Sequence, residues 1–436
     1  MKKTVCAFAV IVGIIATYFI CSTYFGSGNI LNALDGTYSN LFYDFNLSDN
    51  TESGSYPVVD FDYSVSKSAV SPSDYYNYNK LNDTQKAMYK DIYNAAITMQ
   101  VGNVRLSDGS KRDAAIAMYA VKYDNPQIFW LGYEYGLGTS SDDTVFIRLD
   151  EGKKEGGYLF THDERTAMMQ ELHEAVIKIV NECVTPDMSE YEIELALHDW
   201  ICINVEYDKK SSDVATSGER SKANHSAWTA YGALVNRSAV CEGYSKAFQL
   251  LMYYTGINCN LLSGVTSDQT AHMWNIVQLS DSWYNVDVLW NDVEDSQFAP
   301  IHSFFNVTTE FISKTHTLYP DSTTVDKDDK IFTAEYNLAI PSCINTELNY
   351  YVYNNTLIES DELYAKVVTE ALKRASEEGR GTVEFFYNYK DINKNVVSYD
   401  AKKNRIFSSV KGYFKDFKGL KYEAFSYGSF IISVAK

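Results

Sequence analysis

Three residues whose side chains together could activate a thiol occur in one stretch, between Ala239 and Asp292: Cys241, His272 and Asp287. A free cysteine has a pKa of about 8.5, so the thiol is mostly protonated and unreactive near neutral pH. A histidine base oriented by a carboxylate can take the thiol proton and leave a nucleophilic sulfur. The question is whether the chain positions these three side chains together.

The segment Ala239–Phe248 (AVCEGYSKAF) predicts that Cys241 stands where an irregular segment becomes an apolar helix. A helix N-terminus carries partial positive charge and unpaired N–H groups, which favour a thiolate and could donate to an oxyanion. Gly243 in the first turn permits close approach of backbone or substrate. The expected position of Cys241 is therefore suited to nucleophilic chemistry.

Two predicted strands follow, Ala271–Val277 with His272 and Trp283–Trp290 with Asp287. A two-residue turn at Asp281–Ser282 would make opposed positions sum to an odd number, and His272 and Asp287 would then share one face of the hairpin. The carboxylate could hold one ring nitrogen and fix the histidine tautomer. Each residue also has a purely structural explanation, because a cysteine can pack, a histidine can hydrogen bond and an aspartate can cap a turn.

The residues around the three side chains resemble a known family. The segments VCEGYS (240–245), HMWN (272–275) and WYNVD (283–287), followed by WND (290–292), are similar to the signature blocks of the transglutaminase-like family of papain-like cysteine enzymes. The resemblance extends over about Met188 to Thr309 and is typical of bacterial secreted or membrane-anchored members. Met273 and Leu289 depart from the usual small alanine and threonine, which could alter the cleft but leaves the triad intact.

This resemblance implies an α+β fold, in which the cysteine-bearing helix packs on an antiparallel sheet that carries the histidine and the aspartate. It also implies that Cys241 is the nucleophile, His272 the general base and Asp287 the orienting carboxylate. The expected chemistry is peptide hydrolysis or acyl transfer through a cysteine thioester, with a peptide or protein as substrate. The alternative is a non-enzymatic cell-surface binding module that retains the fold.

Composition and other motifs narrow the remaining possibilities. The net charge of −19 argues against binding nucleic acid, which requires clustered lysine and arginine. The sequence has no Walker motif and no GxGxxG, and its seven histidines are dispersed, so no cofactor and no metal are expected. Five cysteines follow the N-terminal segment without a CxxC pair; Cys183, Cys202 and Cys259 lie in apolar surroundings and are predicted to be buried thiols.

The N-terminus reads as a targeting segment. Lys2 and Lys3 precede an uninterrupted apolar run from Val5 to Cys21, and no clear small-residue cleavage site follows it. Its length lies between that of a signal peptide and that of a membrane anchor, so both remain open. Either one places the rest of the chain outside the cytoplasm, secreted or held at the membrane by this segment.

The remaining patterns predict the organisation of the chain, without indicating its oligomeric state. The expected parts are a targeting segment (1–25), a spacer (26–75), a mixed α/β region (76–185), the catalytic domain (186–320), a charged linker (321–345) and a C-terminal α+β sandwich (346–436). The predicted helices are 82–99, 113–121, 161–183, 188–205, 226–235, 360–378 and 400–414; the predicted strands are 128–131, 144–147, 349–357, 381–387, 422–425 and 430–434; and 209–224 is expected to be a loop.

Overall fold

The computed structural model describes residues 74–132, 135–149, 159–216, 224–293, 300–319, 324–325, 332–333, 339–387 and 406–435. The predicted targeting segment, and the spacer apart from its last two residues, lie outside these ranges. Within them, no helix is long and apolar enough to cross a membrane. The chain forms two compact units, the first comprising residues up to Leu289 with Thr309–Cys343, and the second comprising Trp290–Thr308 with Ile344–Lys436.

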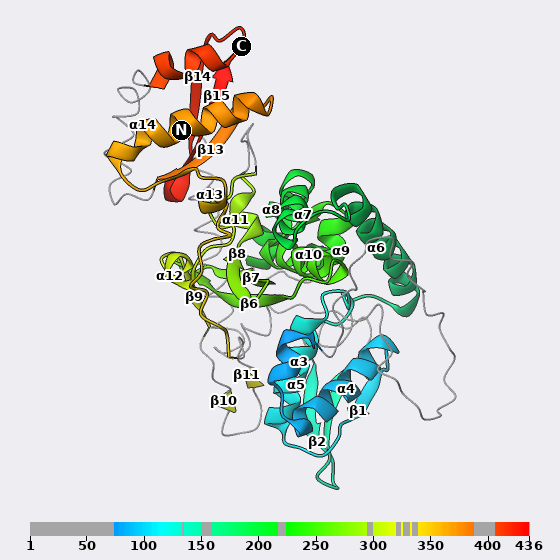
Figure 1. Cartoon of the computed structure of the whole chain (residues 1–436). Helices are drawn as coiled ribbons and strands as arrows, with labels where there is room; N and C mark the ends of the chain where they lie inside the picture. The colour runs from blue at the N-terminus through cyan, green and yellow to red at the C-terminus, as the bar shows by residue number, and fades with distance from the viewer. Residues whose placement is uncertain are drawn as a thin grey trace. The chain divides into compact units, whose positions relative to one another are not determined.

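The first unit is organised around an antiparallel four-stranded sheet. Its strands lie in the order β8 (Ser282–Val286), β7 (Ala271–Leu279), β6 (Cys259–Thr266) and β9 (His316–Leu318). The helix α10 (Cys241–Tyr254) packs on β7 and β6, as Figure 1 shows. The predicted fold class, a cysteine-bearing helix on an antiparallel sheet, is confirmed.

Helix α10 is almost wholly buried because other helices also cover it. It contacts α6 (His162–Cys183), α7 (Glu190–Asn204) and α9 (Ala230–Leu234). Its residues Glu242 to Tyr254 are all buried, which explains why apolar side chains occur around the whole helix and not on one stripe. The charged side chains of Glu242 and Lys246 form an ion pair inside this packing. The helix is therefore a fixed support for Cys241.

Local sequence explains where the surrounding helices begin. Asn82, Ser110, Thr161 and Ser189 each form a capping box with the residue three positions later. Such a box satisfies backbone N–H groups that have no partner within the helix. These caps start α4 (Asp83–Ile97), α5 (Lys111–Asp124), α6 and α7, in agreement with the predicted helices.

The region N-terminal to the core belongs to the same unit. The side-chain amide of Gln249 on α10 donates to the Tyr123 carbonyl at 2.8 Å, and the Asn77 amide donates to Asn260 Oδ1 on β6 at 2.7 Å. Both contacts are buried, so this region helps to hold the helix and sheet of the core. Its other elements are α3 (Tyr76–Lys80) and a sheet in the order β1 (Gly102–Arg105), β3 (Val145–Leu149) and β2 (Gly136–Thr139).

Three predictions of local structure in this unit were wrong or incomplete. Residues 128–131 form turns and not a strand, with the Ile128 N–H donating to the Asn125 carbonyl at 3.0 Å. The predicted loop 209–224 begins with a helix, α8 (Lys209–Thr216), whose first turn follows Asp208. The predicted helix 226–235 is two pieces, η3 (His225–Trp228) and α9, because the Thr229 side chain caps a new helix.

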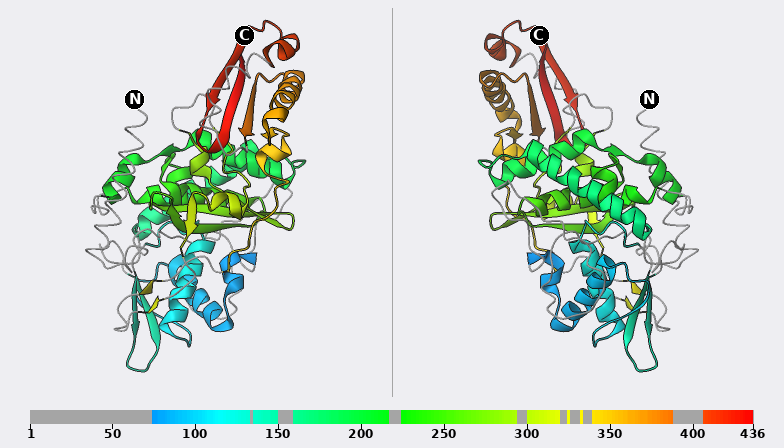
Figure 2. Two further views of the ribbon diagram at one scale, coloured as in Figure 1. Left: turned by 90° about the vertical axis from the view of Figure 1, so that its left-hand side faces the viewer. Right: turned by 90° about the vertical axis from the view of Figure 1, so that its right-hand side faces the viewer.

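The second unit is a small α+β structure. Its sheet has the order β12 (Leu357–Ile358), β13 (Thr382–Tyr387), β15 (Ser429–Ala435) and β14 (Gly419–Ala424). Helix α14 (Asp361–Glu377) lies along this sheet in Figure 2 and shares one apolar core with it. The predicted strand 349–357 was wrong: the Asn349 side chain accepts from the Tyr351 N–H and begins the helix α13 (Tyr350–Tyr353).

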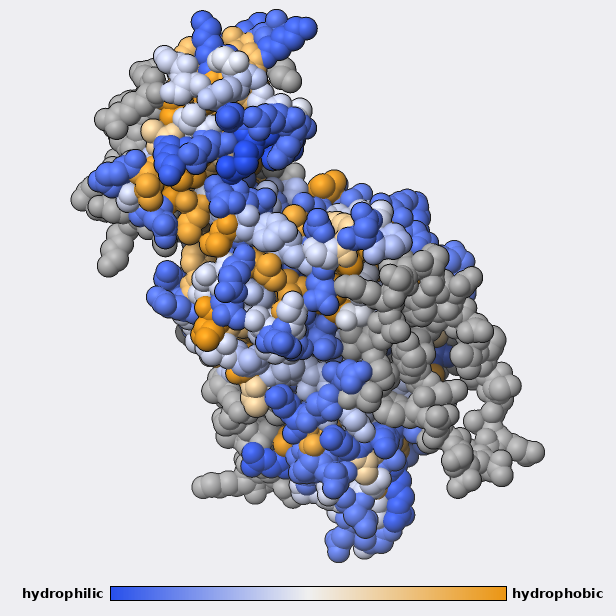
Figure 3. Space-filling model, viewed as in Figure 1, coloured by the Kyte–Doolittle hydropathy of each residue, from blue (hydrophilic) through white to orange (hydrophobic). Residues whose placement is uncertain are grey.

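Among the residues that are coloured in Figure 3, hydrophilic ones predominate on the face that is drawn. The remaining elements of the chain are short. These elements are β4 (Glu206–Tyr207), β5 (Ser238–Ala239), α11 (Val288–Asn291), α12 (Thr309–Ile312), β10 (Thr324–Val325), β11 (Phe332–Thr333), η4 (Lys411–Tyr413) and η5 (Ser426–Gly428).

Candidate active site

Cys241 is the first residue of α10 and its thiol is free and half-buried. The helix passes very close to a neighbouring segment: a Cβ at Gly243 would lie 2.5 Å from the Ala227 carbonyl oxygen and 2.7 Å from the Ala239 Cβ. Only glycine fits such an approach to backbone. The predicted role of Gly243 in a close approach thus applies to the chain's own backbone, which fixes the start of the helix beside residues 227–229.

Polar contacts fix the same helix against the strand that carries the histidine. The Ser245 hydroxyl lies 3.0 Å from the Met273 carbonyl, and the Asn275 amide donates to the Ser245 carbonyl at 3.0 Å. Since Met273 follows His272 directly, these buried contacts set the height of His272 along α10. A buried hydrogen bond of this kind contributes about 1 kcal/mol and, more importantly, permits one alignment only.

The β7–β8 hairpin places His272 and Asp287 on one face. Asn275 pairs with Val286 and Leu279 pairs with Ser282, so opposed positions sum to an odd number, as predicted. The two-residue turn is Ser280–Asp281, one residue earlier than expected. Asp287 is the residue immediately after β8, where the chain leaves the sheet.

The three side chains named from the sequence come together. His272 Nε2 lies 2.6 Å from Asp287 Oδ2, and both side chains are almost fully buried. The Cys241 side chain lies close enough to the His272 ring to raise its pKa. Because Asp287 engages Nε2, Nδ1 is the ring nitrogen left for the thiol.

Burial and charge act in opposite directions on this pair. Burial alone would lower the pKa of His272, but the Asp287 carboxylate and the adjacent Cys241 side chain raise it to about 10. Burial alone would raise the pKa of Asp287, but the His272 and His316 rings hold it well below its usual range. The site near neutral pH is therefore an imidazolium paired with a carboxylate.

A second histidine, which the sequence did not reveal, also contacts Asp287. His316 Nε2 lies 3.0 Å from the same oxygen, Oδ2, and its other ring nitrogen lies 2.8 Å from the Thr315 hydroxyl. Its ring packs at 4.9 Å from the ring of Trp274. His316 lies on an edge strand of three residues without a motif, so only the pairing of Thr266 with His316 identifies it.

His272, Asp287 and His316 also form a group that could hold a metal ion, since their ligand atoms lie within 4.8 Å of one another. These atoms already hydrogen bond to each other, so a metal would have to replace both contacts to Asp287. No chemistry proposed below requires a metal, and its expected absence stays a prediction.

A half-buried tyrosine, Tyr207, lies near the thiol. Burial raises the pKa of Tyr207 above its usual range, and the charge of Cys241 acts in the same direction. The Tyr207 hydroxyl donates to the Ser212 hydroxyl at 3.1 Å. Next to it, Ala227, Trp228 and Val240 form a small apolar cluster, so one side of Cys241 is shielded from water.

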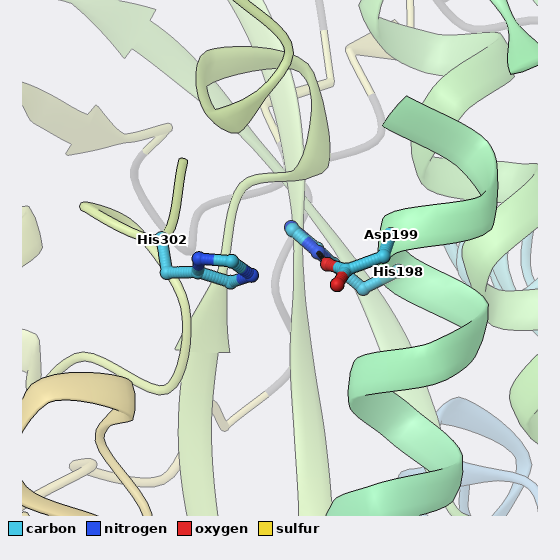
Figure 4. A group of neighbouring side chains, drawn as sticks. All are labelled: His198, Asp199 and His302. Carbon is cyan, nitrogen blue, oxygen red and sulfur yellow. Dashed lines mark hydrogen bonds and ion pairs between the residues drawn. The ribbon is translucent and has the colours of Figure 1, made fainter. Parts of the chain in front are cut away.

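The chain contains another group of the same residue types. On α7, Cys202 Sγ lies 3.8 Å from His198 Nε2, and His198 Nδ1 lies 2.8 Å from Asp199 Oδ1. Figure 4 shows His198 and Asp199 side by side on that helix. The Cys202 thiol is buried and donates to the Val288 carbonyl at 3.4 Å. Cys202 and Cys259 are thus buried as predicted, whereas Cys183 is only half-buried.

Comparison with known proteins identifies the same region. Residues 177–288 match the family model of the transglutaminase-like superfamily. The kyphoscoliosis peptidase of Mus musculus is 22% identical over 162 residues, which is 34% of this chain and 23% of that protein. The Homo sapiens protein of the same name is 24% identical over 143 residues, or 29% of this chain and 20% of that protein.

The match thus spans less than a quarter of these relatives. Among solved structures, a crystal structure of a TGase gives a TM-score of 0.26 at 13% identity, covering 44% of this chain and 50% of that one. Residues 177–288, which include Cys241, His272 and Asp287, are thus similar to the transglutaminase-like superfamily.

Proposed function

We propose that the protein is a thiol enzyme that acts on peptides or proteins through an acyl-thioester at Cys241. The observation that carries this proposal is that the Cys241 thiol lies next to the His272 ring, which is 2.6 Å from the Asp287 carboxylate. A thiol, a base and an orienting carboxylate at hydrogen-bond distance are what nucleophilic catalysis by cysteine requires.

In the proposed first half-reaction, Cys241 Sγ attacks the substrate carbonyl carbon while the thiol proton resides on His272. The new C–S bond moves the carbonyl electron pair onto oxygen. Backbone N–H groups at the start of α10 then donate to the oxyanion and stabilise it. His272 donates its proton to the leaving amine, the C–N bond breaks, and the thioester remains.

In the second half-reaction, water or an amine attacks the thioester carbon. His272 takes a proton from the incoming nucleophile. The C–S bond breaks, and Cys241 leaves as a thiolate that keeps the electron pair of that bond. Water gives hydrolysis and an amine gives a cross-link, so the two activities share the first half of the path. The relatives are named peptidases, and hydrolysis is therefore the first activity to test.

A glutamine-containing peptide library, incubated with and without a fluorescent primary amine, would test the proposal and separate the two activities. Cleaved peptides indicate hydrolysis of the peptide backbone. Deamidated glutamine indicates attack by water on the glutamine side chain, and fluorescent product indicates transfer to the amine. Cys241→Ala is the control and should form none of these. Iodoacetamide labelling at neutral pH should be faster in the wild type than in Cys241→Ala.

Equal labelling of the two proteins would contradict an activated thiol and would favour a non-enzymatic binding module. The proposal also includes an extracytoplasmic location, on the basis of the apolar run Val5–Cys21 and the preceding lysines. Protease accessibility of the full chain on intact cells would test that location, and protection of the chain would contradict it.

A further inference from the structure

We propose that His316, supported by a hydrogen bond from Thr315, is a positioning residue that holds Asp287 in the orientation His272 requires. This inference rests on the proposed function, because it concerns the same triad. The hydrogen bond from His316 to Asp287 is its starting observation.

His316 reaches the triad from the far side of the sheet. Asp287 follows β8 at one edge, whereas His316 belongs to β9 at the other edge, with β7 and β6 between them. The chain leaves β8 at Val286, and the Asp287 carboxylate then meets both histidines beyond the end of that strand. Asp287 is thus held from two directions, which one hydrogen bond alone would not achieve.

The hydrogen-bond partners define the tautomer of His316. The ring is fully buried next to a charged His272, and burial lowers its pKa, so it is neutral and carries one ring proton. An ionised carboxylate only accepts, so that proton lies on Nε2 and points to Asp287 Oδ2. Nδ1 is then an acceptor, and the Thr315 hydroxyl at 2.8 Å donates to it.

The Thr315 hydroxyl has a competing acceptor, the Ile312 carbonyl, at the longer distance of 3.2 Å. The Ile312 carbonyl also faces the His316 ring, as do the His272 ring at 5.3 Å and the Trp274 ring. The charged groups that act on the ring are Asp287 and His272. Asp287 therefore selects the tautomer with the proton on Nε2, and the Thr315 hydroxyl supports it by donating to Nδ1.

A neutral donor on Asp287 has a distinct use during catalysis. When His272 releases its proton to the leaving group, Asp287 loses its charged partner. The His316 N–H remains in place, so the carboxylate stays ionised and keeps its orientation for the next proton transfer. Without that donor the Asp287 carboxylate takes up a proton at higher pH. The low-pH side of the pH–activity profile (the acid limb) therefore moves to higher pH.

Three variants separate this role from simple packing. His316→Ala removes the donor, His316→Gln keeps an amide N–H near the position of Nε2, and Thr315→Val removes the hydroxyl that donates to Nδ1. Two quantities are measured from pH 4 to pH 9: the rate of Cys241 alkylation by iodoacetamide, and kcat/KM on any peptide substrate found above. Circular dichroism and thermal melting show which variants are folded.

For His316→Ala we expect a loss of about 10- to 100-fold in kcat/KM. We also expect an acid limb about one pH unit higher, since a hydrogen bond to a charged group is lost. His316→Gln should recover most of both effects, and Thr315→Val should move the limb in the same direction by less. If His316→Ala does not fold, the comparison of His316→Gln with Thr315→Val still tests the inference. The acid limb should move clearly in Thr315→Val and stay near its wild-type position in His316→Gln.

The inference is overturned if the limb stays at its wild-type position in the folded variants while the rate falls equally at every pH. It is also overturned if glutamine at position 316 performs no better than alanine. Alkylation needs no substrate, so the two proposals can fail separately. Absence of peptide turnover with a limb that still moves would contradict the proposed function and leave the role of His316 intact.

Discussion

The described residues of the first unit include two groups of cysteine, histidine and aspartate, and we propose a catalytic role for only one of them. Cys241, His272 and Asp287 come from a helix start, a strand and the end of a second strand. Cys202, His198 and Asp199 come from consecutive turns of a single helix, α7. Both groups contain a histidine at hydrogen-bond distance from an aspartate, 2.6 Å in the first and 2.8 Å in the second.

The two groups differ in what surrounds the sulfur. The Cys202 thiol lies in the middle of a helix, is 4% exposed, and donates its proton to a backbone carbonyl. The Cys241 thiol lies at a helix start, where N–H groups lack helical partners, and it is open enough to be half-buried only. Residue types and short distances are therefore insufficient, and the environment of the thiol decides whether a nucleophile results.

Replacing the two cysteines should give the largest contrast. Cys241→Ala removes the nucleophile, and we expect activity to fall by about 10⁴-fold or more, to the level of the uncatalysed reaction. Cys202→Ala should change kcat/KM by less than about threefold, because its sulfur does not face a substrate. Steady-state kinetics on one peptide substrate measures both, and comparable losses in the two variants would contradict the distinction.

Neutralising the two aspartates should give the next largest contrast. Asp287→Asn keeps the shape of the side chain but no longer stabilises the imidazolium, and we expect a fall in kcat of about 10³- to 10⁴-fold. Asp199→Asn is the matched control and should leave kcat nearly unchanged. Should Asp287→Asn retain more than a tenth of the wild-type kcat, the carboxylate does not orient the base.

The pH dependence of stability should also separate the two aspartates. The raised pKa of His272, about 10, means that its contribution to stability is complete below its ordinary pKa of about 6.5 and is lost as the pH rises towards 10. The lowered pKa of Asp287 means that its contribution is present above about 3.9 and is lost as the pH falls further. The pair is thus fully stabilising between about pH 4 and pH 6.5.

Asp287→Asn should accordingly lower the free energy of unfolding by about 3 kcal/mol near pH 6, and by less near pH 10. Asp199→Asn, in which the original carboxylate is partly exposed, should show a smaller difference. Urea denaturation of the three proteins at several pH values gives these differences. A penalty for Asp287→Asn that grows with rising pH would have the wrong sign for an imidazolium–carboxylate pair.

The smallest expected effect concerns packing. Cys202→Ala removes a buried sulfur and its hydrogen bond to Val288, and it should lower the free energy of unfolding by about 1 kcal/mol. The half-buried position of Cys241 suggests that Cys241→Ala will cost less. Thermal melts measure both losses of stability. A larger loss for Cys241→Ala than for Cys202→Ala would indicate that Cys241, and not Cys202, is the structural thiol.

Local patterns predicted most of the site. The apolar helix after Val240 located Cys241 at a helix start, and alternation along the hairpin placed His272 and Asp287 on one face. The turn itself was displaced by one residue, because Ser280 adopts a positive φ of 53°, which is not predictable from a serine side chain. Moving the turn by one residue keeps the sum of the paired residue numbers odd. His272 and Asp287 therefore stay on the same face, and the prediction of the site was unaffected.

His316 was not predictable because its position depends on pairing between distant strands. Its strand has three residues, too few for a clear alternating pattern, and it joins β6 at a sheet edge. The turns at residues 128–131 were missed for a related reason: a short apolar run fills a core equally well as a strand or as turns. In each case, contacts made elsewhere in the chain decided the local structure.

Asp287 contacts one histidine on the neighbouring strand β7 and another on β9 at the opposite edge of the sheet, which has a consequence for folding. Its contact with His272 spans 15 residues and forms within one hairpin, whereas its contact with His316 spans 29 residues and requires β9 to have joined the sheet. Contacts between more distant residues cost more chain entropy and generally form later. We therefore expect the hydrogen bonds around Asp287 to be complete only after β9 has joined the sheet.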